Sequence, residues 1–401
     1  MRILIAVAGG PSHLYPLVPL ARAFRDAGHA VRLAGTPRAT ETMTKTGLPT
    51  VALGSGPALS PQARQELLKT AYGQPPWPAD WPAHPESLGP EQIQLLEVLG
   101  RYSVATAEGM AGALVDFATD WRPDVIVHDT LALGALAAAC RLGVPCFRYS
   151  HGTQDVFKVE HRITDGEPLP EYAAFLARFG IDPPTASPSY VDTVPPSMFI
   201  GAERPAVAMR WVPYNGPGTA PDGLTGPRRR PRICVTWGLV VPNALGSAAA
   251  DPDGDVIAAA VDAGADVLAL TTEDQSLAAP PAGVRYVIGA PLKLVLPHCD
   301  VIVHHGGEGT AMAAASLSVP QLVITREPLD DQCGGRLATT GAAIHLRHQH
   351  LAADPSSRGT IRDAIDKLLS DPGHADAAVR LHEDVERQPA PAEVVDALLP
   401  H

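Results

Sequence analysis

Short, continuously apolar runs alternate along the chain with longer segments in which apolar residues recur at helical spacing. Arg2–Val7 is such a run, Leu17–Ala27 shows the helical spacing, and Val31–Ala34 is apolar again. The same order returns later in the first half, in the segments Asp124–His128, Leu131–Leu142 and Val144–Arg148. Strand, helix and strand in this order predict parallel strands that are joined by crossover helices.

A segment rich in proline and glycine divides the chain into two such halves. Residues 212–232 read VPYNGPGTAPDGLTGPRRRPR and lack apolar periodicity, which is typical of an interdomain linker. The strand pattern then restarts, and the strands predicted there are Ile233–Thr236, Asp266–Leu270, Val284–Ile288, Val301–His304 and Gln321–Ile324. We therefore predict an N-terminal domain over residues 1–211, a linker over 212–232 and a C-terminal domain over 233–388.

The composition fits two folded domains and disfavours several kinds of partner. The chain has 401 residues, 45% of them hydrophobic, which is enough for two ordinary cores. Its 31 basic and 43 acidic residues give a net charge of −12, whereas a nucleic-acid backbone is bound by basic surfaces. The five cysteines are odd in number and form no CxxC pair, and no run approaches the roughly 18 apolar residues of a membrane span. We expect a cytoplasmic protein without a nucleic-acid partner or stable membrane insertion.

A glycine-rich turn between an apolar strand and a helix is the most specific motif. Residues 301–310 read VIVHHGGEGT, so two histidines end the strand and the glycines follow at once. Glycines admit close approach of a ligand to the backbone, and a helix start offers unpaired N–H groups to an anion. This arrangement suits a diphosphate, whereas the P-loop and dinucleotide-binding patterns do not occur in the sequence. The alternative is a tight strand-to-helix turn with incidental histidines.

Two further polar residues follow predicted strands of the first half. His13 comes after the strand Arg2–Val7, and Asp129 directly follows the strand Asp124–His128. Residues at the carboxyl ends of parallel strands face the ligand crevice, and an imidazole titrates near neutral pH. The position and the pKa of His13 therefore suit proton abstraction. A surface histidine and a helix-capping aspartate are the alternatives.

These motifs together resemble the GT-B glycosyltransferases, and most of all the actinobacterial branch that attaches deoxysugars to polyketides and related natural products. The resemblance rests on HHGGEGT at 304–310, VPQLVI at 319–324 and the pair Asp331 and Gln332, and it extends to residues 2–31 and to the ending QPAPAEVVDALL. It implies an α/β fold with two Rossmann-like domains, whose mostly parallel sheets face each other across a cleft. It also implies a terminal helix over residues 389–401 that packs back toward the N-terminal domain.

The resemblance also assigns roles to individual residues. It makes His13 the general base that deprotonates the acceptor hydroxyl and Asp129 the residue that orients this base. The contacts that it implies for the nucleotide sugar are His304, Gly306, Gly307, Gly309, Thr310, Asp331 and Gln332, with backbone groups of Ala290 and Leu292 at the nucleobase. His305 is the weaker candidate of the two histidines. No metal or resident cofactor is implied, because a histidine and backbone N–H groups can stabilise the leaving group.

The sequence therefore favours an inverting glycosyltransferase that moves a deoxysugar from a dTDP donor to a hydroxyl of an apolar aglycone. The nucleotide sugar is then a co-substrate, and the aglycone is a small-molecule partner. Two alternatives stay open: a nucleotide-sugar epimerase or hydrolase of the same fold, and a non-catalytic helper of a partner transferase. The sequence does not determine the sugar, the acceptor, the linkage atom, the choice between dTDP and UDP, or whether a homodimer forms.

Overall fold

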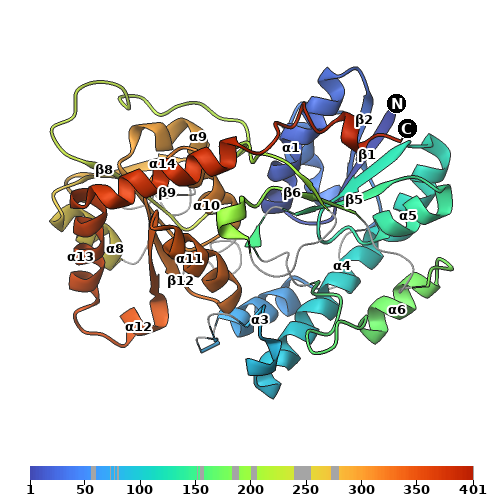
Figure 1. Ribbon diagram of the computed structural model, residues 1–401, viewed down its shortest axis with the longest axis horizontal. Helices are drawn as coiled ribbons and strands as arrows, with labels where there is room; N and C mark the ends of the chain where they lie inside the picture. The colour runs from blue at the N-terminus through green and yellow to red at the C-terminus, as the bar shows by residue number, and fades with distance from the viewer. Residues whose placement is uncertain are drawn as a thin grey trace.

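A computed structural model of the chain shows two α/β domains, each built on an all-parallel sheet that is covered by helices (Figure 1). The structure describes residues 1–55, 60–72, 74–75, 77–78, 81–150, 152–153, 158–182, 189–199, 206–238, 254–271 and 280–400. The pair of parallel-sheet α/β domains expected from the sequence is confirmed.

The N-terminal domain has a seven-stranded sheet with the strand order β3-β2-β1-β4-β5-β6-β7. Its strands are β1 (Arg2–Val7), β2 (Ala30–Gly35), β3 (Thr50–Ala52), β4 (Val125–His128), β5 (Cys146–Ser150), β6 (Ser189–Asp192) and β7 (Ala206–Ala208). Its helices include α1 (Pro11–Asp26), α2 (Thr40–Thr44), α3 (Pro61–Tyr72), α4 (Pro90–Trp121), α5 (Gly134–Leu142) and α6 (Pro170–Ala177). Strand order reverses between β1 and β4, and ligands of such sheets bind at the carboxyl ends of the strands beside this reversal.

The C-terminal domain repeats this plan with six strands in the order β10-β9-β8-β11-β12-β13. Its strands are β8 (Arg232–Thr236), β9 (Asp266–Thr271), β10 (Val284–Ile288), β11 (Val301–His304), β12 (Gln321–Thr325) and β13 (Ala343–Arg347). Its helices include α8 (Gly254–Asp262), α9 (Leu292–Val295), α10 (Glu308–Ala315), α11 (Pro328–Thr340), α12 (His348–Ala352), α13 (Ser357–Ser370) and α14 (Pro372–Glu386). Here the reversal lies between β8 and β11.

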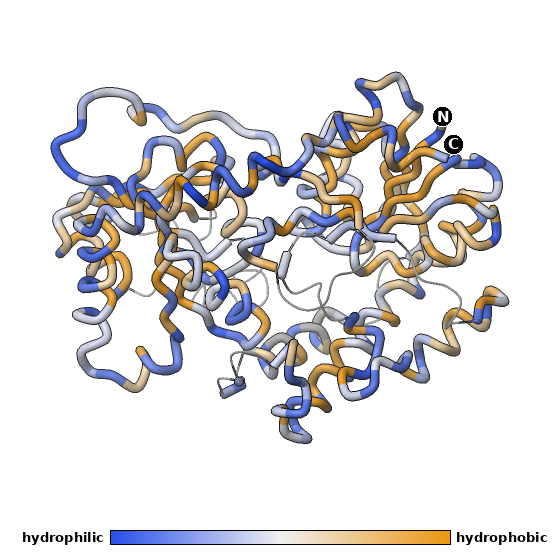
Figure 2. The backbone as a smooth tube through the Cα atoms, viewed as in Figure 1, coloured by the Kyte–Doolittle hydropathy of each residue, from blue (hydrophilic) through white to orange (hydrophobic). Residues whose placement is uncertain are grey.

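The central strands of each sheet are buried on both faces, which is why they read as continuous apolar runs rather than as alternating ones. On β1, Ile3 and Ile5 join the cluster formed with α1, whereas Leu4 and Ala6 join the cluster formed with α4 and α5. Figure 2 shows the most hydrophobic stretches gathered in the strands inside each domain. The cores therefore fix the sheets and leave the strand ends to carry polar residues.

Helix α1 begins at Pro11, well before the predicted start at Leu17, so His13 lies in its first turn and not in a loop. Proline fits the first turn of a helix, where its missing N–H would have no helical partner. Pro16 and Pro19 lie inside the helix. Internal prolines usually break helices, which is why the pattern placed the start too late. The corrected start ties the His13 backbone to a helix that packs on β1.

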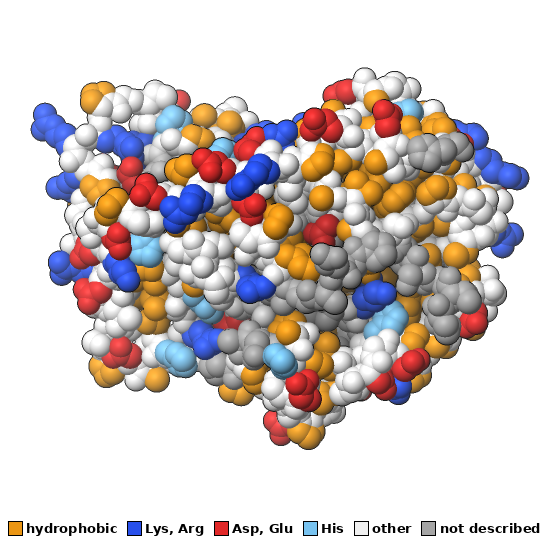
Figure 3. Space-filling model, in the orientation of Figure 1, with side chains coloured by type: hydrophobic (Ala, Val, Ile, Leu, Met, Phe, Trp, Pro, Cys, Tyr) orange, Lys and Arg blue, Asp and Glu red, His pale blue; other side chains and the backbone are white. Residues whose placement is uncertain are grey.

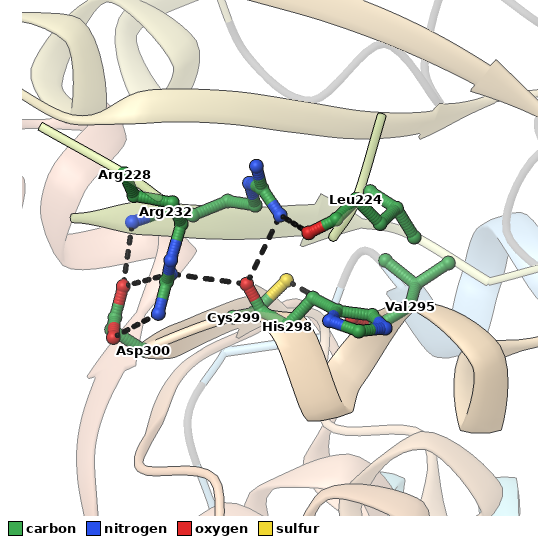
Figure 4. A network of polar contacts seen from close by, with 7 residues as sticks. All are labelled: Leu224, Arg228, Arg232, Val295, His298, Cys299 and Asp300. Carbon is green, nitrogen blue, oxygen red and sulfur yellow. Dashed lines mark hydrogen bonds and ion pairs between the residues drawn. The ribbon is translucent and has the colours of Figure 1, made fainter. Parts of the chain in front are cut away.

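Residues 212–231, all of which the structure describes, form neither helix nor strand and are anchored by arginines (Figure 4). The guanidinium of Arg228 lies 2.7 Å from a carboxylate oxygen of Asp300. Arg232 donates its backbone N–H to Asp300 at 2.7 Å and its guanidinium to the Leu224 carbonyl at 2.9 Å. These contacts fix the segment at the amino ends of β8 and β11, away from the strand ends that follow His304.

The predicted helix over residues 389–401 is wrong, because the last α-helix of the structure is α14, which ends at Glu386. Residues 389–400 form turns and one short 3-10 turn. Pro389 and Pro391 remove two of the backbone donors that an α-helix would use. The segment does pack on the N-terminal domain, into whose core it inserts Val394, Val395 and Leu398.

Basic and acidic side chains are mixed over the described part of the face drawn in Figure 3. No helix in the described ranges is long and apolar enough to cross a membrane. Likewise, the described side chains include no group of three or more His, Cys, Asp or Glu residues placed to hold a metal ion.

Candidate active site

The carboxyl ends of β1 and β4 bring His13 and Asp129 together. Asp129 follows β4 directly and donates its backbone N–H to the carbonyl of Ala6 on β1 at 3.0 Å. The His13 Nδ1 atom, in the first turn of α1, lies 3.4 Å from Asp129 Oδ2. The side chain of His13 is 24% exposed and that of Asp129 is 1% exposed. The imidazole is therefore accessible while the carboxylate lies behind it, which is the arrangement of a base and its orienting acid.

Backbone donors hold the Asp129 carboxylate in place. Its Oδ2 accepts from the Gly9 N–H at 2.9 Å, and its Oδ1 accepts from the N–H groups of Ala8 at 3.2 Å and Ala132 at 2.8 Å. The bond to Ala132 closes the turn before α5, whose N-cap is Leu133 without a side-chain cap bond, so Asp129 does not cap that helix. The His13 ring packs directly on the backbone of Gly9, where a Cβ would lie 2.3 Å from Cγ of His13.

In the C-terminal domain, β8 and β11 end side by side and the chain turns into α10. The strand pair aligns His304 with Thr236. Gly306, in the turn, has a φ of +101°, a conformation that favours glycine, and a Cβ there would come within 2.9 Å of Thr325. The N–H of Thr310, a predicted phosphate contact, donates to the Gly307 carbonyl at 3.0 Å. The Thr310 hydroxyl is thus the better group for a ligand contact.

The structure places His304, the predicted phosphate contact, inside the core with no exposed surface. Its Nε2 lies 2.9 Å from Oε1 of Gln321, and its Nδ1 accepts from the Gly306 N–H at 3.1 Å. Both ring nitrogens are thus engaged within the fold. Since β11 is buried on both faces, its apolar pattern could not show which histidine points outward.

His305 lies against two glycines and is the histidine suited to a ligand. A Cβ at Gly307 would lie 2.5 Å from its Nε2, and one at Gly238 would lie 2.9 Å from its Cε1. His305 is 7% exposed, and its Nδ1 has no hydrogen-bond partner among the described residues. A buried, unpartnered imidazole nitrogen beside a helix start is suited to an anion. These glycines, and the polar Gln321 beside His304, are the sequence signals that could have separated the two histidines.

Asp331 and Gln332 lie in the first turns of α11, and the structure gives them partners that sequence reasoning missed. The Asp331 carboxylate accepts from the Thr325 hydroxyl and lies 2.9 Å from Arg347 Nε and 3.4 Å from His345 Nε2. Burial acts to raise the pKa of Asp331, but these partners hold it below its ordinary value. Gln332 is buried. The expected sugar-binding carboxylate is therefore already oriented by β12 and β13.

The remaining predicted contacts, Ala290 and Leu292, flank the turn between β10 and α9. Leu292 is the first residue of α9 and is buried, and Ala290 packs half-buried against the same cluster. Ile288, the last residue of β10, is 49% exposed beside them. Trp237, at the end of β8, fills the core.

A hydrogen bond joins the two sets of strand-end loops across the domains. Thr153 follows β5 in the N-terminal domain, and its hydroxyl donates to Oε1 of Glu308, the first residue of α10, at 2.6 Å. Both residues are buried. A Cβ at Gly152 would lie 2.3 Å from the Glu308 carboxyl carbon, so this approach depends on a glycine. The contact holds the loops after β5 and β11 against each other.

Three buried histidines near the site predict that acid destabilises the fold. Burial lowers the pKa of His128 and His304 to about 4 and that of His305 to about 3. In the unfolded chain these groups titrate near 6.5, so below that pH the unfolded state binds more protons than the folded one. Stability is therefore expected to fall as the pH drops from about 6.5 toward about 4. Urea unfolding midpoints at several pH values check this, and a His305→Asn variant should show a shallower slope. A midpoint independent of pH would contradict it.

Two Rossmann-like domains, with the imidazole of His13 beside the carboxylate of Asp129 on one and a glycine-rich turn before α10 on the other, match the arrangement of GT-B glycosyltransferases. Comparison with known proteins agrees. The N-terminal and C-terminal domain models of the erythromycin biosynthesis protein CIII-like family match residues 22–238 and 254–400, and the chain belongs to that family.

Characterised relatives align with nearly the whole chain. A 10-deoxymethynolide desosaminyltransferase of Streptomyces venezuelae is 32% identical, covering 99% of this chain and 96% of the relative. The TDP-daunosamine transferase DnrS of Streptomyces peucetius is 30% identical, covering 99% and 96%. Among solved structures, the glycosyltransferase VinC in complex with dTDP is 28% identical with a TM-score of 0.78, covering 99% of this chain and 98% of that one.

Proposed function

We propose that this glycosyltransferase moves a deoxysugar from a thymidine diphosphate donor to a hydroxyl of an apolar natural-product aglycone, with inversion at the anomeric carbon. The observation that carries the proposal is the accessible His13 backed by Asp129, on the domain opposite the His305 turn. The relatives named above support it, since their names record desosaminyl transfer, transfer from TDP-daunosamine and a complex with dTDP.

The donor lies, in this proposal, at the carboxyl ends of β8 and β11. His305 and the N–H groups of Gly307 and Gly309 bind the diphosphate, which Gly306 and the start of α10 allow to approach the backbone. Asp331 and Gln332 bind sugar hydroxyls, and the backbone around Ala290 and Leu292 contacts the nucleobase. The Thr310 hydroxyl adds a phosphate contact. These assignments replace His304 with His305.

The reaction is a single displacement. The acceptor hydroxyl oxygen attacks the anomeric carbon as its proton passes to Nε2 of His13, whose Nδ1 faces Asp129. The new C–O bond forms as the bond from the anomeric carbon to the diphosphate oxygen breaks, and the electron pair leaves with the nucleotide diphosphate. His305 and the helix-start N–H groups stabilise that developing charge. Asp129 stabilises the imidazolium that forms.

Sugar transfer is tested with purified protein, TDP-L-rhamnose or TDP-daunosamine, and the aglycones 10-deoxymethynolide or aklavinone. We expect a conjugate whose mass equals aglycone plus sugar, with the anomeric configuration opposite to that of the donor. Mass spectrometry and NMR of the product read these out. Consumption of donor equally fast without acceptor would favour the hydrolase or epimerase, and failure to bind TDP in calorimetry would favour the helper subunit.

A further inference from the structure

A buried ion pair lies directly behind the loop that carries Asp129. Arg148 on β5 is 5% exposed and Glu160 is 2% exposed. One guanidinium nitrogen of Arg148 contacts Oε1 of Glu160, and the other lies 3.3 Å from Oε2, so the pair is bidentate. Burial acts to raise the pKa of Glu160, but the charge of Arg148 holds it below its ordinary value. Both groups are therefore charged inside the domain.

Such a pair is a costly way to fill a core. The free-energy cost of removing two charges from water offsets most of the attraction between them. Apolar residues of similar volume often stabilise a fold as well or better. What apolar residues cannot supply is a directed hydrogen bond. Arg148 makes one beyond the pair, because its Nη2 also donates to the carbonyl of Thr130 at 3.3 Å.

Thr130 connects this hydrogen bond to the candidate base. It directly follows Asp129, and its hydroxyl oxygen lies 3.4 Å from Nδ1 of His13. Arg148 thus holds the backbone carbonyl of Thr130, and the side-chain hydroxyl of the same residue contacts the imidazole of His13. β5 pairs with β4 in parallel register, with His128 aligned with Arg148, so the contact is built into the sheet.

Glu160 is in turn fixed from the other side. The Leu169 N–H donates to the Glu160 carbonyl at 3.0 Å. The neighbouring carbonyl of Val159 packs against α4, where a Cβ at Gly100 would lie 2.1 Å from it. The carboxylate is therefore held by a segment that is itself clamped between α4 and residue 169.

We propose that Arg148, held by Glu160, is a positioning residue for the His13–Asp129 pair. It acts through the Thr130 peptide and does not touch substrate. The inference rests on the proposed role of His13 as the base. Losing Arg148 would leave His13 on α1 and the Asp129 carboxylate on its backbone donors, but would release the Thr130 peptide, whose side-chain hydroxyl contacts Nδ1 of His13.

The test replaces the pair as a whole, since Arg148→Met alone would leave a buried, unpaired carboxylate and could unfold the domain. The double variant R148M/E160M keeps volume and removes both charges. We expect its melting temperature to stay at or above that of the wild type, the donor KM to stay unchanged, and kcat to fall by about tenfold or more. The control is R178M/E108M, which removes the exposed pair of Arg178 and Glu108 in the same domain and should leave kcat unchanged.

A second readout is independent of sugar transfer. In ¹⁵N-histidine-labelled protein, the His13 signals are identified by their loss in His13→Asn, and their nitrogen shifts report which ring nitrogen carries the proton. We expect the Nδ1–H form in the wild type and in R178M/E108M, and a mixture of forms in R148M/E160M. A folded R148M/E160M protein with wild-type kcat and an unchanged His13 signal would overturn the proposal. A wild type that transfers no sugar, yet whose His13 signal responds to R148M/E160M, would overturn the proposed function and leave the positioning role standing.

Discussion

His13→Ala is expected to lower kcat for sugar transfer by about a thousandfold while leaving the affinity for TDP unchanged. A positioned general base contributes roughly 10² to 10⁴ to a rate, and the nucleotide is proposed to bind on the other domain. The variant should fold normally, because the His13 side chain is partly exposed and alanine is a good helix former. Steady-state rates and calorimetric titration with TDP measure the two effects separately.

Asp129→Asn should reduce kcat by a similar factor, because an amide can present its N–H₂ to Nδ1 and favour the wrong tautomer. The control is His29→Ala, which changes a histidine just beyond the far end of α1, where the ring contacts Phe24. This variant should retain wild-type kcat. A His13→Ala enzyme with more than about a tenth of wild-type kcat would contradict the general-base role.

His305→Ala is expected to weaken TDP binding by about 10- to 100-fold with little loss of stability. A hydrogen bond to a charged group contributes roughly 1.5–3 kcal/mol, and the His305 Nδ1 has no partner within the described part of the chain that the substitution would strand. Calorimetry with TDP and urea unfolding of the same preparation measure both quantities.

The matched variant is His304→Ala, one residue away, for which the expected effects are reversed. It strands Oε1 of the buried Gln321 and the Gly306 N–H, so the free energy of unfolding should fall by about 1–3 kcal/mol. Its TDP affinity should fall less than that of His305→Ala. If His304→Ala loses the nucleotide and His305→Ala keeps it, the assignment of the two histidines is reversed.

The sheets were the predictable part of the fold. β1 and β11 match their predicted bounds to the residue, because a parallel strand buried on both faces is a plain apolar run between polar turns. β10 matches too, although it lies at the edge of its sheet with Arg285 and Ile288 exposed. The start of α1 was not predictable in this way, since Pro16 and Pro19 disguise a helix that its packing on β1 sustains. The pair of His13 and Asp129 was predictable from the family resemblance, and it forms because strand ends beside a reversal of strand order converge.

What sequence could not supply are the partners that only the folded chain brings together. The position of the His305 ring depends on the missing side chain of Gly238, which follows β8, whereas His305 follows β11. Asp331 receives Arg347 from the neighbouring strand β13, and Thr153 reaches Glu308 from the other domain. None of these contacts produces a periodic pattern in the sequence, because each joins residues that are far apart in the chain.

The central claim is that a nucleotide diphosphate binds at the His305 turn, opposite His13. A crystal structure of the protein with TDP tests it most directly. The account predicts a diphosphate oxygen within hydrogen-bond distance of a ring nitrogen of His305 and of the first N–H groups of α10, with the terminal phosphate directed toward His13. TDP bound elsewhere, or held in this region without any contact to His305 or α10, would contradict it.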